Sequence, residues 1–287
     1  MDMVVYSKTV NLQPENEEKT FFAYKKSSVL KPGINRKEFF PMFELKTQIG
    51  VKSYSFREIK DNGACADAIR YCASSVVDLS GTHVNYDDPA SWAGVIAAYR
   101  ARDIAIAGIG AVEVRPDEAW NRRFFDFARQ AGAKLVSLSF QMEDWEKSVA
   151  SVEKLTEEYQ IPAAIHNHGG YNWLGNATAL AYVFKRSSRR LGLCLDTAWC
   201  IHTERENPVE WMEKFGGRTY GFHFKDFTWD RNGKHSDVIV GEGALDLPAV
   251  LARFKELDTI RSAVLEYEGK DAVECTKKSI ENIRNLY

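Results

Sequence analysis

The chain has 287 residues, of which 45% are hydrophobic, and its formal net charge is −2. This length fits one large α/β domain, and the near-neutral charge gives no indication of a nucleic-acid partner or an anionic membrane surface. Five cysteines without a C-x-x-C pair are typical of a reduced, cytoplasmic protein, and no apolar run approaches the roughly 18 residues that span a bilayer.

The N-terminal residues 1–45 differ in pattern from the rest of the chain. Their composition is mixed and charged, and Lys31-Pro32-Gly33 is typical of a turn. We expect an N-terminal extension of unknown role here, followed by one domain over residues 46–287. The extension would pack either on this domain or on a second subunit of a homo-oligomer.

Short apolar runs recur at a regular interval from about residue 46 onwards. Successive starts are 27 to 30 residues apart, except for the last interval of 43. A strand, a crossover helix and two loops need about this length, and nearly continuous apolar runs are typical of buried parallel strands. The runs begin near Ile49, Val76, Ile104, Lys134, Ala163, Gly192, Tyr220 and Ala263.

Helical patterns separate these runs. Residues 119–131, 144–159 and 271–287 carry apolar side chains at helical spacing, and Asn207-Pro208 is typical of a helix start. Strands and helices in this alternation predict a (βα)₈ TIM barrel. The alternative is a doubly wound open sheet, but that fold normally has a glycine-rich turn after its first strand, and VKSYSFREIK has none.

Potential metal ligands stand at the ends of the last four predicted strands, which are His166, Asp196, His223 and Glu266. The carboxyl ends of barrel strands meet at one face, so these side chains are expected to converge. Two imidazoles and two carboxylates suit a divalent metal such as Mn, Zn, Fe or Co. A single such residue would more often be a buried core histidine or a helix cap, but four in consecutive strands favour a metal site.

Three tryptophans follow predicted strands: Trp173, Trp199 and Trp229. An indole at this position can stack on the apolar face of a sugar ring or can pack a loop, and the sequence leaves both open. Glu242, in the Gly241-Glu242-Gly243 loop, is a further candidate substrate contact, or it merely shapes the turn.

The second half of the chain resembles the sugar phosphate isomerase/epimerase group of xylose isomerase-like TIM barrels, a superfamily that also contains endonuclease IV. The resemblance is carried by AAIHNHGG, CLDTAW, GFHFKDF and VLEYEG, that is, by an H-N-H, a D-x-x-W and an H-x-K-D motif. It implies the same barrel fold and metal-dependent chemistry on a small sugar.

The resemblance also implies a ligand set. Glu, Asp, His and Glu hold the metal in this superfamily, and the last three map onto Asp196, His223 and Glu266. His166 stands where the first Glu is usual, and His168 is its rival. Endonuclease IV needs a richer ligand set than six histidines supply, so a role in DNA repair is not expected.

The expected reaction is isomerisation or epimerisation of a small sugar or keto-sugar through an enediolate-type intermediate. Glu266 or His168 would remove the proton, and Lys225 would bind a substrate oxygen or donate a proton. Two alternatives remain open at this point. One is a metal-dependent lyase or dehydratase for a keto-sugar or keto-inositol, and the other is a non-catalytic sugar-binding barrel.

Overall fold

The computed structural model describes residues 43–170, 172–204 and 207–287. The predicted N-terminal extension therefore lies almost entirely outside the described residues. Among the residues that are described, no helix is both long enough and apolar enough to cross a bilayer.

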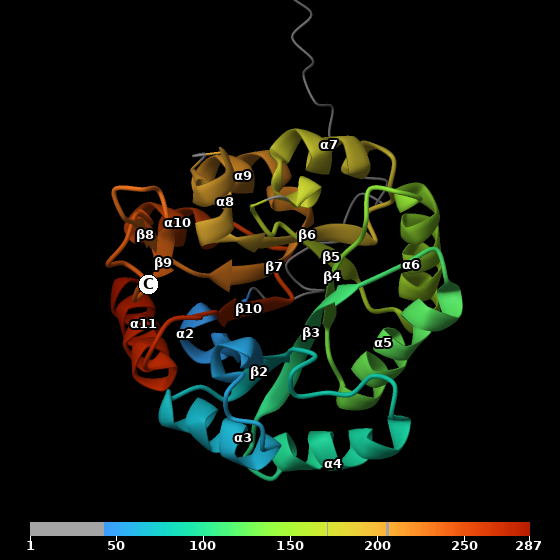
Figure 1. Cartoon of the computed structure of the whole chain (residues 1–287), viewed down its shortest axis with the longest axis horizontal. Helices are drawn as coiled ribbons and strands as arrows, with labels where there is room; N and C mark the ends of the chain where they lie inside the picture. The colour runs from blue at the N-terminus through green and yellow to red at the C-terminus, as the bar shows by residue number, and fades with distance from the viewer. Residues whose placement is uncertain (1–42, 171, 205–206) are drawn as a thin grey trace, which may run out of the picture. The chain divides into compact units, whose positions relative to one another are not determined.

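Eight parallel strands close into a barrel in the order β1-β10-β7-β6-β5-β4-β3-β2 (Figure 1). Each predicted start lies within one residue of the observed start, so the predicted barrel is confirmed. The strands are β1 (Gly50–Lys52), β2 (Val76–Leu79), β3 (Ala105–Glu113), β4 (Leu135–Ser139), β5 (Ala163–His166), β6 (Leu191–Asp196), β7 (Thr219–Phe224) and β10 (Ser262–Leu265).

Helices surround the barrel on its outside (Figure 1). They are α2 (Leu45–Gln48), α3 (Asn62–Tyr71), α4 (Pro89–Arg100), α5 (Glu118–Ala131), α6 (Trp145–Tyr159), α7 (Ala177–Lys185), α8 (Thr197–Glu204), α9 (Pro208–Phe215), α10 (Leu247–Phe254) and α11 (Ala272–Leu286). Short 3₁₀ turns occur at η1 (Ser53–Phe56), η2 (Trp173–Gly175) and η3 (Gly216–Arg218).

The helix boundaries follow local chemistry. In α5 the side chain of Asp117 caps the first turn, and Gly132 ends the helix with a φ of 79°. Asn207 accepts the Val209 N–H at the start of α9, as its Asn-Pro sequence predicts. Apolar faces such as that of α5, with Phe124 buried, then cover the strands.

The strands of the second half of the barrel are buried on both faces. All six residues of β6 and all six of β7 are buried, because one face lines the barrel interior and the other packs under helices. This explains why these strands have no alternating polar pattern. Their histidine and carboxylate side chains, His166, Asp196 and His223, occur at or near the carboxyl ends, where the site lies.

A two-stranded antiparallel hairpin follows β7 and was not predicted. Its strands are β8 (Phe227–Trp229) and β9 (His235–Asp237). The carboxylate of Asp230 accepts the N–H groups of Asn232 and Lys234, and Gly233 has a φ of 80° in the turn. Since the hairpin follows the carboxyl end of a barrel strand, it belongs to the face that carries the candidate site.

Candidate metal centre

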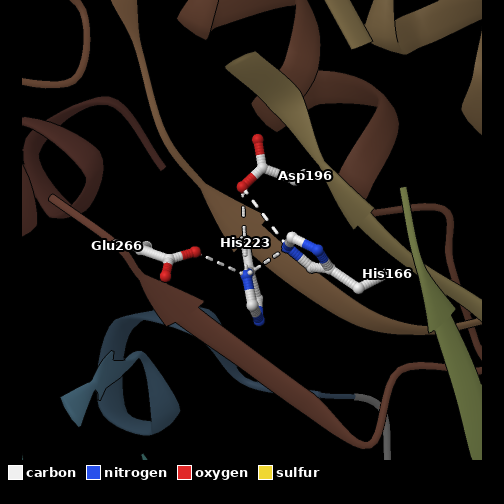
Figure 2. A group of neighbouring side chains, drawn as sticks. All are labelled: His166, Asp196, His223 and Glu266. Atoms are coloured by element: carbon white, nitrogen blue, oxygen red, sulfur yellow. Dashed lines mark hydrogen bonds and ion pairs between the residues drawn. The ribbon is translucent and has the colours of Figure 1, made fainter. Parts of the chain in front are cut away.

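The structure brings the four predicted ligands together at the carboxyl ends of four adjacent strands. His166 ends β5, Asp196 ends β6, His223 lies within β7, and Glu266 directly follows β10. One ligand atom from each residue lies within 4.8 Å of all the others, and all four residues are buried. Figure 2 shows their side chains pointing toward one another.

The shortest distances in the cluster centre on His223. Its Nδ1 atom lies 3.0 Å from Oε2 of Glu266 and 3.2 Å from Nε2 of His166. The Oδ2 atom of Asp196 lies 3.7 Å from Nε2 of His166 and 3.9 Å from Nδ1 of His223. Two nitrogens and two oxygens therefore face a common space.

The two oxygens of the Asp196 carboxylate differ in their hydrogen bonding. Oδ1 accepts the Trp199 N–H at 2.9 Å in the first turn of α8. Oδ2 is buried and has no hydrogen-bond partner among the described residues. A buried carboxylate oxygen without a donor is costly, and a bound cation removes that cost. The donor set therefore fits a metal ion.

Asn167 holds the backbone at Asp196. Its Oδ1 atom accepts the Asp196 N–H at 2.6 Å, and its Nδ2 group donates to the Asp196 carbonyl at 3.1 Å. Asn167 is fully buried. Asn167 thus aligns the end of β6 with the end of β5. This is a structural role for the middle residue of the H-N-H motif, and the sequence did not reveal it.

The electrostatics of the cluster are those of a cation site. Burial alone would raise the pKa of Glu266, but the charges of Lys225 and His223 hold it well below its usual value. Burial alone would lower the pKa of His223, but the interactions with Cys194 and Glu266 hold it well above its usual value. Burial lowers the pKa of His166. A positive charge among the carboxylates is therefore favoured.

His168 lies apart from the four-residue cluster. β5 ends at His166, so the chain has already left the strand and His168 is exposed. Its ring centroid lies 6.0 Å from that of His166 and 4.3 Å from the Trp199 indole, tilted by 32°. Of the two rival histidines, the geometry thus groups His166 with the other ligand candidates and puts His168 at the mouth of the site.

Lys225 and Asp226, which follow β7, have different surroundings. The ammonium of Lys225 is buried and forms an ion pair with Glu268. Burial alone would lower the pKa of Lys225, but the carboxylates of Glu266 and Asp196 raise it, so the side chain is charged. The carboxylate of Asp226 instead accepts the N–H groups of Gly241, Gly243 and Leu245, so it supports a loop and is not part of the ligand cluster.

The three candidate tryptophans are not equivalent. Trp199 is 8% exposed and packs against His168 beside the cluster. Trp173 donates to the Phe140 carbonyl at 3.1 Å and packs on the hydrophobic core. Trp229 lies on the hairpin and donates to Nδ1 of His202 at 3.2 Å. Trp199 is therefore the one nearest to the predicted ligands.

Glu242, the remaining candidate, occupies the loop that Asp226 organises. Its side chain is exposed, and its N–H closes a turn on the Ile239 carbonyl at 2.9 Å. This position is compatible with either of the two roles that the sequence left open.

Several residues at this face were not singled out from the sequence. The rings of His202 and His235 lie 4.7 Å apart, and both flank Trp199 at 5.3 and 5.2 Å. Asp237 and Glu268 approach Lys225. Only the spacing of Glu266-Tyr267-Glu268 gave a signal, because residues two apart in an extended segment share a face.

Comparisons with known proteins agree with this architecture. The family described as xylose isomerase-like TIM barrel matches residues 119–286. No protein with a curated description matches the chain in sequence. Similar solved structures exist at low sequence identity, which supports a shared fold.

Three of these structures are informative. A xylose isomerase-like TIM barrel protein from Mycobacterium smegmatis, in complex with magnesium, is 15% identical over 85% of this chain and 98% of its own, with a TM-score of 0.68. The IOLI protein with a zinc atom is 15% identical over 83% and 96%, with a TM-score of 0.63. D-psicose 3-epimerase from Clostridium cellulolyticum H10, with D-tagatose, is 13% identical over 83% and 99%, with a TM-score of 0.65.

Proposed function

The chain belongs to the xylose isomerase-like TIM barrel family, and we propose that it is a divalent-metal-dependent isomerase or epimerase of a small sugar or keto-sugar. The observation that carries this proposal is the convergence of His166, Asp196, His223 and Glu266, with a buried Asp196 oxygen that lacks a donor among the described residues. The H-N-H, D-x-x-W and H-x-K-D motifs of the isomerase/epimerase group support it.

The four clustered side chains would hold the metal, through two imidazole nitrogens and two carboxylate oxygens. Such a mixed set suits Mn, Zn, Fe or Co. The structures with magnesium and zinc show that related barrels have been found with divalent metals. When bound, the metal would polarise a substrate carbonyl and an adjacent hydroxyl and so make the neighbouring C–H more acidic.

Proton transfer would fall to Glu266 and His168. Glu266 is kept ionised by Lys225 and His223, so its carboxylate is available as a proton acceptor. His168 is exposed at the mouth, where an imidazole can exchange protons with solvent. The two groups come from the segments that follow two different strands, β10 and β5. Two groups on opposite faces of one carbon would give epimerisation, and one group serving two carbons would give isomerisation.

Substrate orientation would depend on Lys225 and Trp199. The Lys225 ammonium is charged and has three N–H donors, one of which bonds to Glu268. A further donor is available for a substrate hydroxyl or carbonyl oxygen. The Trp199 indole, next to His168, offers an apolar face to a sugar ring. Trp173, Trp229 and Glu242 would contribute farther from the cluster, as walls of the substrate cavity.

The test is hydrogen exchange at carbon. The full chain, loaded with Mn²⁺, is incubated in D₂O with D-tagatose and other unphosphorylated ketohexoses and ketopentoses, and the products are followed by NMR. We expect deuterium at the carbon next to the carbonyl, together with an epimer or an aldose. Glu266→Gln is expected to abolish exchange, whereas Asp230→Asn, in the hairpin turn, retains it.

Two other results would contradict the proposal. Loss of water from the sugar would indicate the lyase alternative. Metal binding without exchange in any sugar of the panel would favour a sugar-binding barrel without turnover.

A further inference from the structure

The Lys225 side chain is held from the outer side of the site by two carboxylates. Its Nζ atom is ion-paired with Oε1 of Glu268 and lies 3.8 Å from Oδ2 of Asp237. The rings of Trp199 and Phe227 lie 5.7 and 5.5 Å from the same nitrogen. Only 1% of the Lys225 side chain is exposed, so its ammonium has a defined place.

Hydrogen bonds fix the carboxylate of Asp237 and the backbone of Glu268. The Glu268 N–H donates to Oδ2 of Asp237 at 2.9 Å, and Arg57 donates to the Glu268 carbonyl at 2.8 Å. Asp237 is part of β9 and pairs with Phe227 in β8. The hairpin therefore supplies one of the two carboxylates that hold Lys225, and the segment after β10 supplies the other. We call this pair, Asp237 and Glu268, the clamp.

A second pair of carboxylates attracts Lys225 from the inner side. Its charge interacts with those of Glu266 and Asp196, which belong to the metal-ligand cluster. A lysine ammonium on its flexible stem takes up whichever ion pair is open to it. Without the outer carboxylates, the Lys225 ammonium would move inward and compete with a metal ion for Glu266 and Asp196.

We propose that Asp237 and Glu268 are positioning residues that hold the Lys225 ammonium on the substrate side of the site and away from the metal-binding carboxylates. The β8–β9 hairpin is thereby a working part of the site and not only a surface insertion. The inference rests on the proposed function for the meaning of the metal cluster, but the position of the ammonium can be measured independently of it.

The experiment compares the full chain with Asp237→Asn/Glu268→Gln. Both substitutions remove a charge and keep the size of the side chain, and the amide introduced in place of the Asp237 carboxylate retains an oxygen that can accept the residue 268 N–H. The chain is labelled with ¹⁵N-lysine, and Lys225→Met identifies the ammonium signal of Lys225. We expect a resolved, slowly exchanging signal in the unsubstituted protein, and a changed chemical shift of this signal in the double variant, because the ammonium then has different carboxylate partners.

Asp230→Asn is the matched control. Asp230 lies in the turn of the same hairpin and accepts backbone N–H groups, which an asparagine can also do. The lysine ammonium spectrum of the Asp230→Asn variant is expected to equal that of the unsubstituted protein. An unchanged Lys225 signal in the folded double variant would overturn the proposal.

Mn²⁺ affinity provides the second readout. The double variant is expected to bind Mn²⁺ at least about tenfold more weakly, because the freed ammonium lies closer to the ligands. Adding Lys225→Met to the double variant is expected to recover most of the lost Mn²⁺ affinity. A misfolded variant would not show this recovery. Absence of recovery would overturn the proposal. If the unsubstituted protein binds no metal but its ammonium signal behaves as expected, the proposed function fails and the clamp stands.

Discussion

The backbone N–H of Trp199 donates a hydrogen bond of 2.9 Å to Oδ1 of Asp196, so the first turn of α8 fixes the carboxylate whose other oxygen faces the cluster. One aspartate thus caps a helix and offers a ligand atom. The helix-cap interpretation and the metal-ligand interpretation of Asp196 are compatible, because they concern different oxygens.

Asp196→Asn separates these two roles. The amide oxygen can still accept the Trp199 N–H, so α8 is expected to remain folded, while the negative charge facing the cluster is lost. We expect the metal affinity to fall by more than about 100-fold. Loss of a residue that only hydrogen-bonds to a metal ligand costs up to about this factor, and loss of a ligand should cost more. Isothermal titration with Mn²⁺ and Zn²⁺ measures this, and far-UV circular dichroism checks the fold. Unaltered affinity would show that Asp196 is not a ligand.

Asn167→Ala tests the support of the ligand. Its side chain makes two hydrogen bonds to the backbone of Asp196. Their loss is expected to reduce metal affinity by about 10- to 100-fold and the free energy of unfolding by about 1–3 kcal/mol. The control is Asn121→Ala, because Asn121 is equally buried and hydrogen-bonded but lies in α5. The control should lose stability and keep its metal affinity, and equal affinities in both variants would argue against the support role.

Metal affinity is expected to increase with pH. Burial alone would lower the pKa of His223, but Cys194 and Glu266 raise it well above its ordinary value of 6.5, so a metal must displace a proton from Nδ1. Protons therefore compete with the metal, and the competition grows as the pH falls. Titrations between about pH 6 and pH 8, in buffers of different ionisation enthalpy, should detect release of about one proton per metal. Affinity that rises with acidity would be inconsistent with ligation by His223.

Asp226→Ala should disorder the loop that follows the hairpin without emptying the metal site. The carboxylate accepts three backbone N–H groups, and a Cβ on Gly243 would lie 2.4 Å from its Oδ1 atom. We expect a loss of about 3 kcal/mol in the free energy of unfolding and faster proteolysis within residues 241–245. Asp246→Ala, which removes only the N-cap of α10, should cost about 1 kcal/mol. Equal losses in the two variants would mean that Asp226 acts only as an ordinary cap.

The barrel could be predicted from the sequence because its signal is periodic. Runs such as GLCLD and AAIH are buried on both faces and recur at the length of a strand-helix unit, so their starts were located to within one residue. The same topology explains why four ligand candidates far apart in the chain could be grouped. The carboxyl ends of parallel strands share one face whatever the loop lengths are.

Other features were beyond the sequence because they depend on where a strand stops or on contacts between loops. Residues two apart share a face of a strand, so alternation cannot separate His166 from His168, whereas in the structure β5 ends at His166. The hairpin strands have only three residues each, too few for a clear alternating pattern. The two carboxylates that hold Lys225 come from the β8–β9 hairpin and from the segment after β10, and no local pattern predicts such a pairing.

The most direct test of the metal site is the metal content of the purified chain, compared with that of His166→Ala and His168→Ala. The two substitutions are chemically identical, and the residues are two positions apart, so each controls for the other. We expect about one Mn, Zn, Fe or Co per chain in the unsubstituted protein and in His168→Ala, and nearly none in His166→Ala. Two results would contradict the assignment of this cluster as the metal centre. One is that His166→Ala retains the metal, and the other is that the unsubstituted protein contains none even after incubation with added metal.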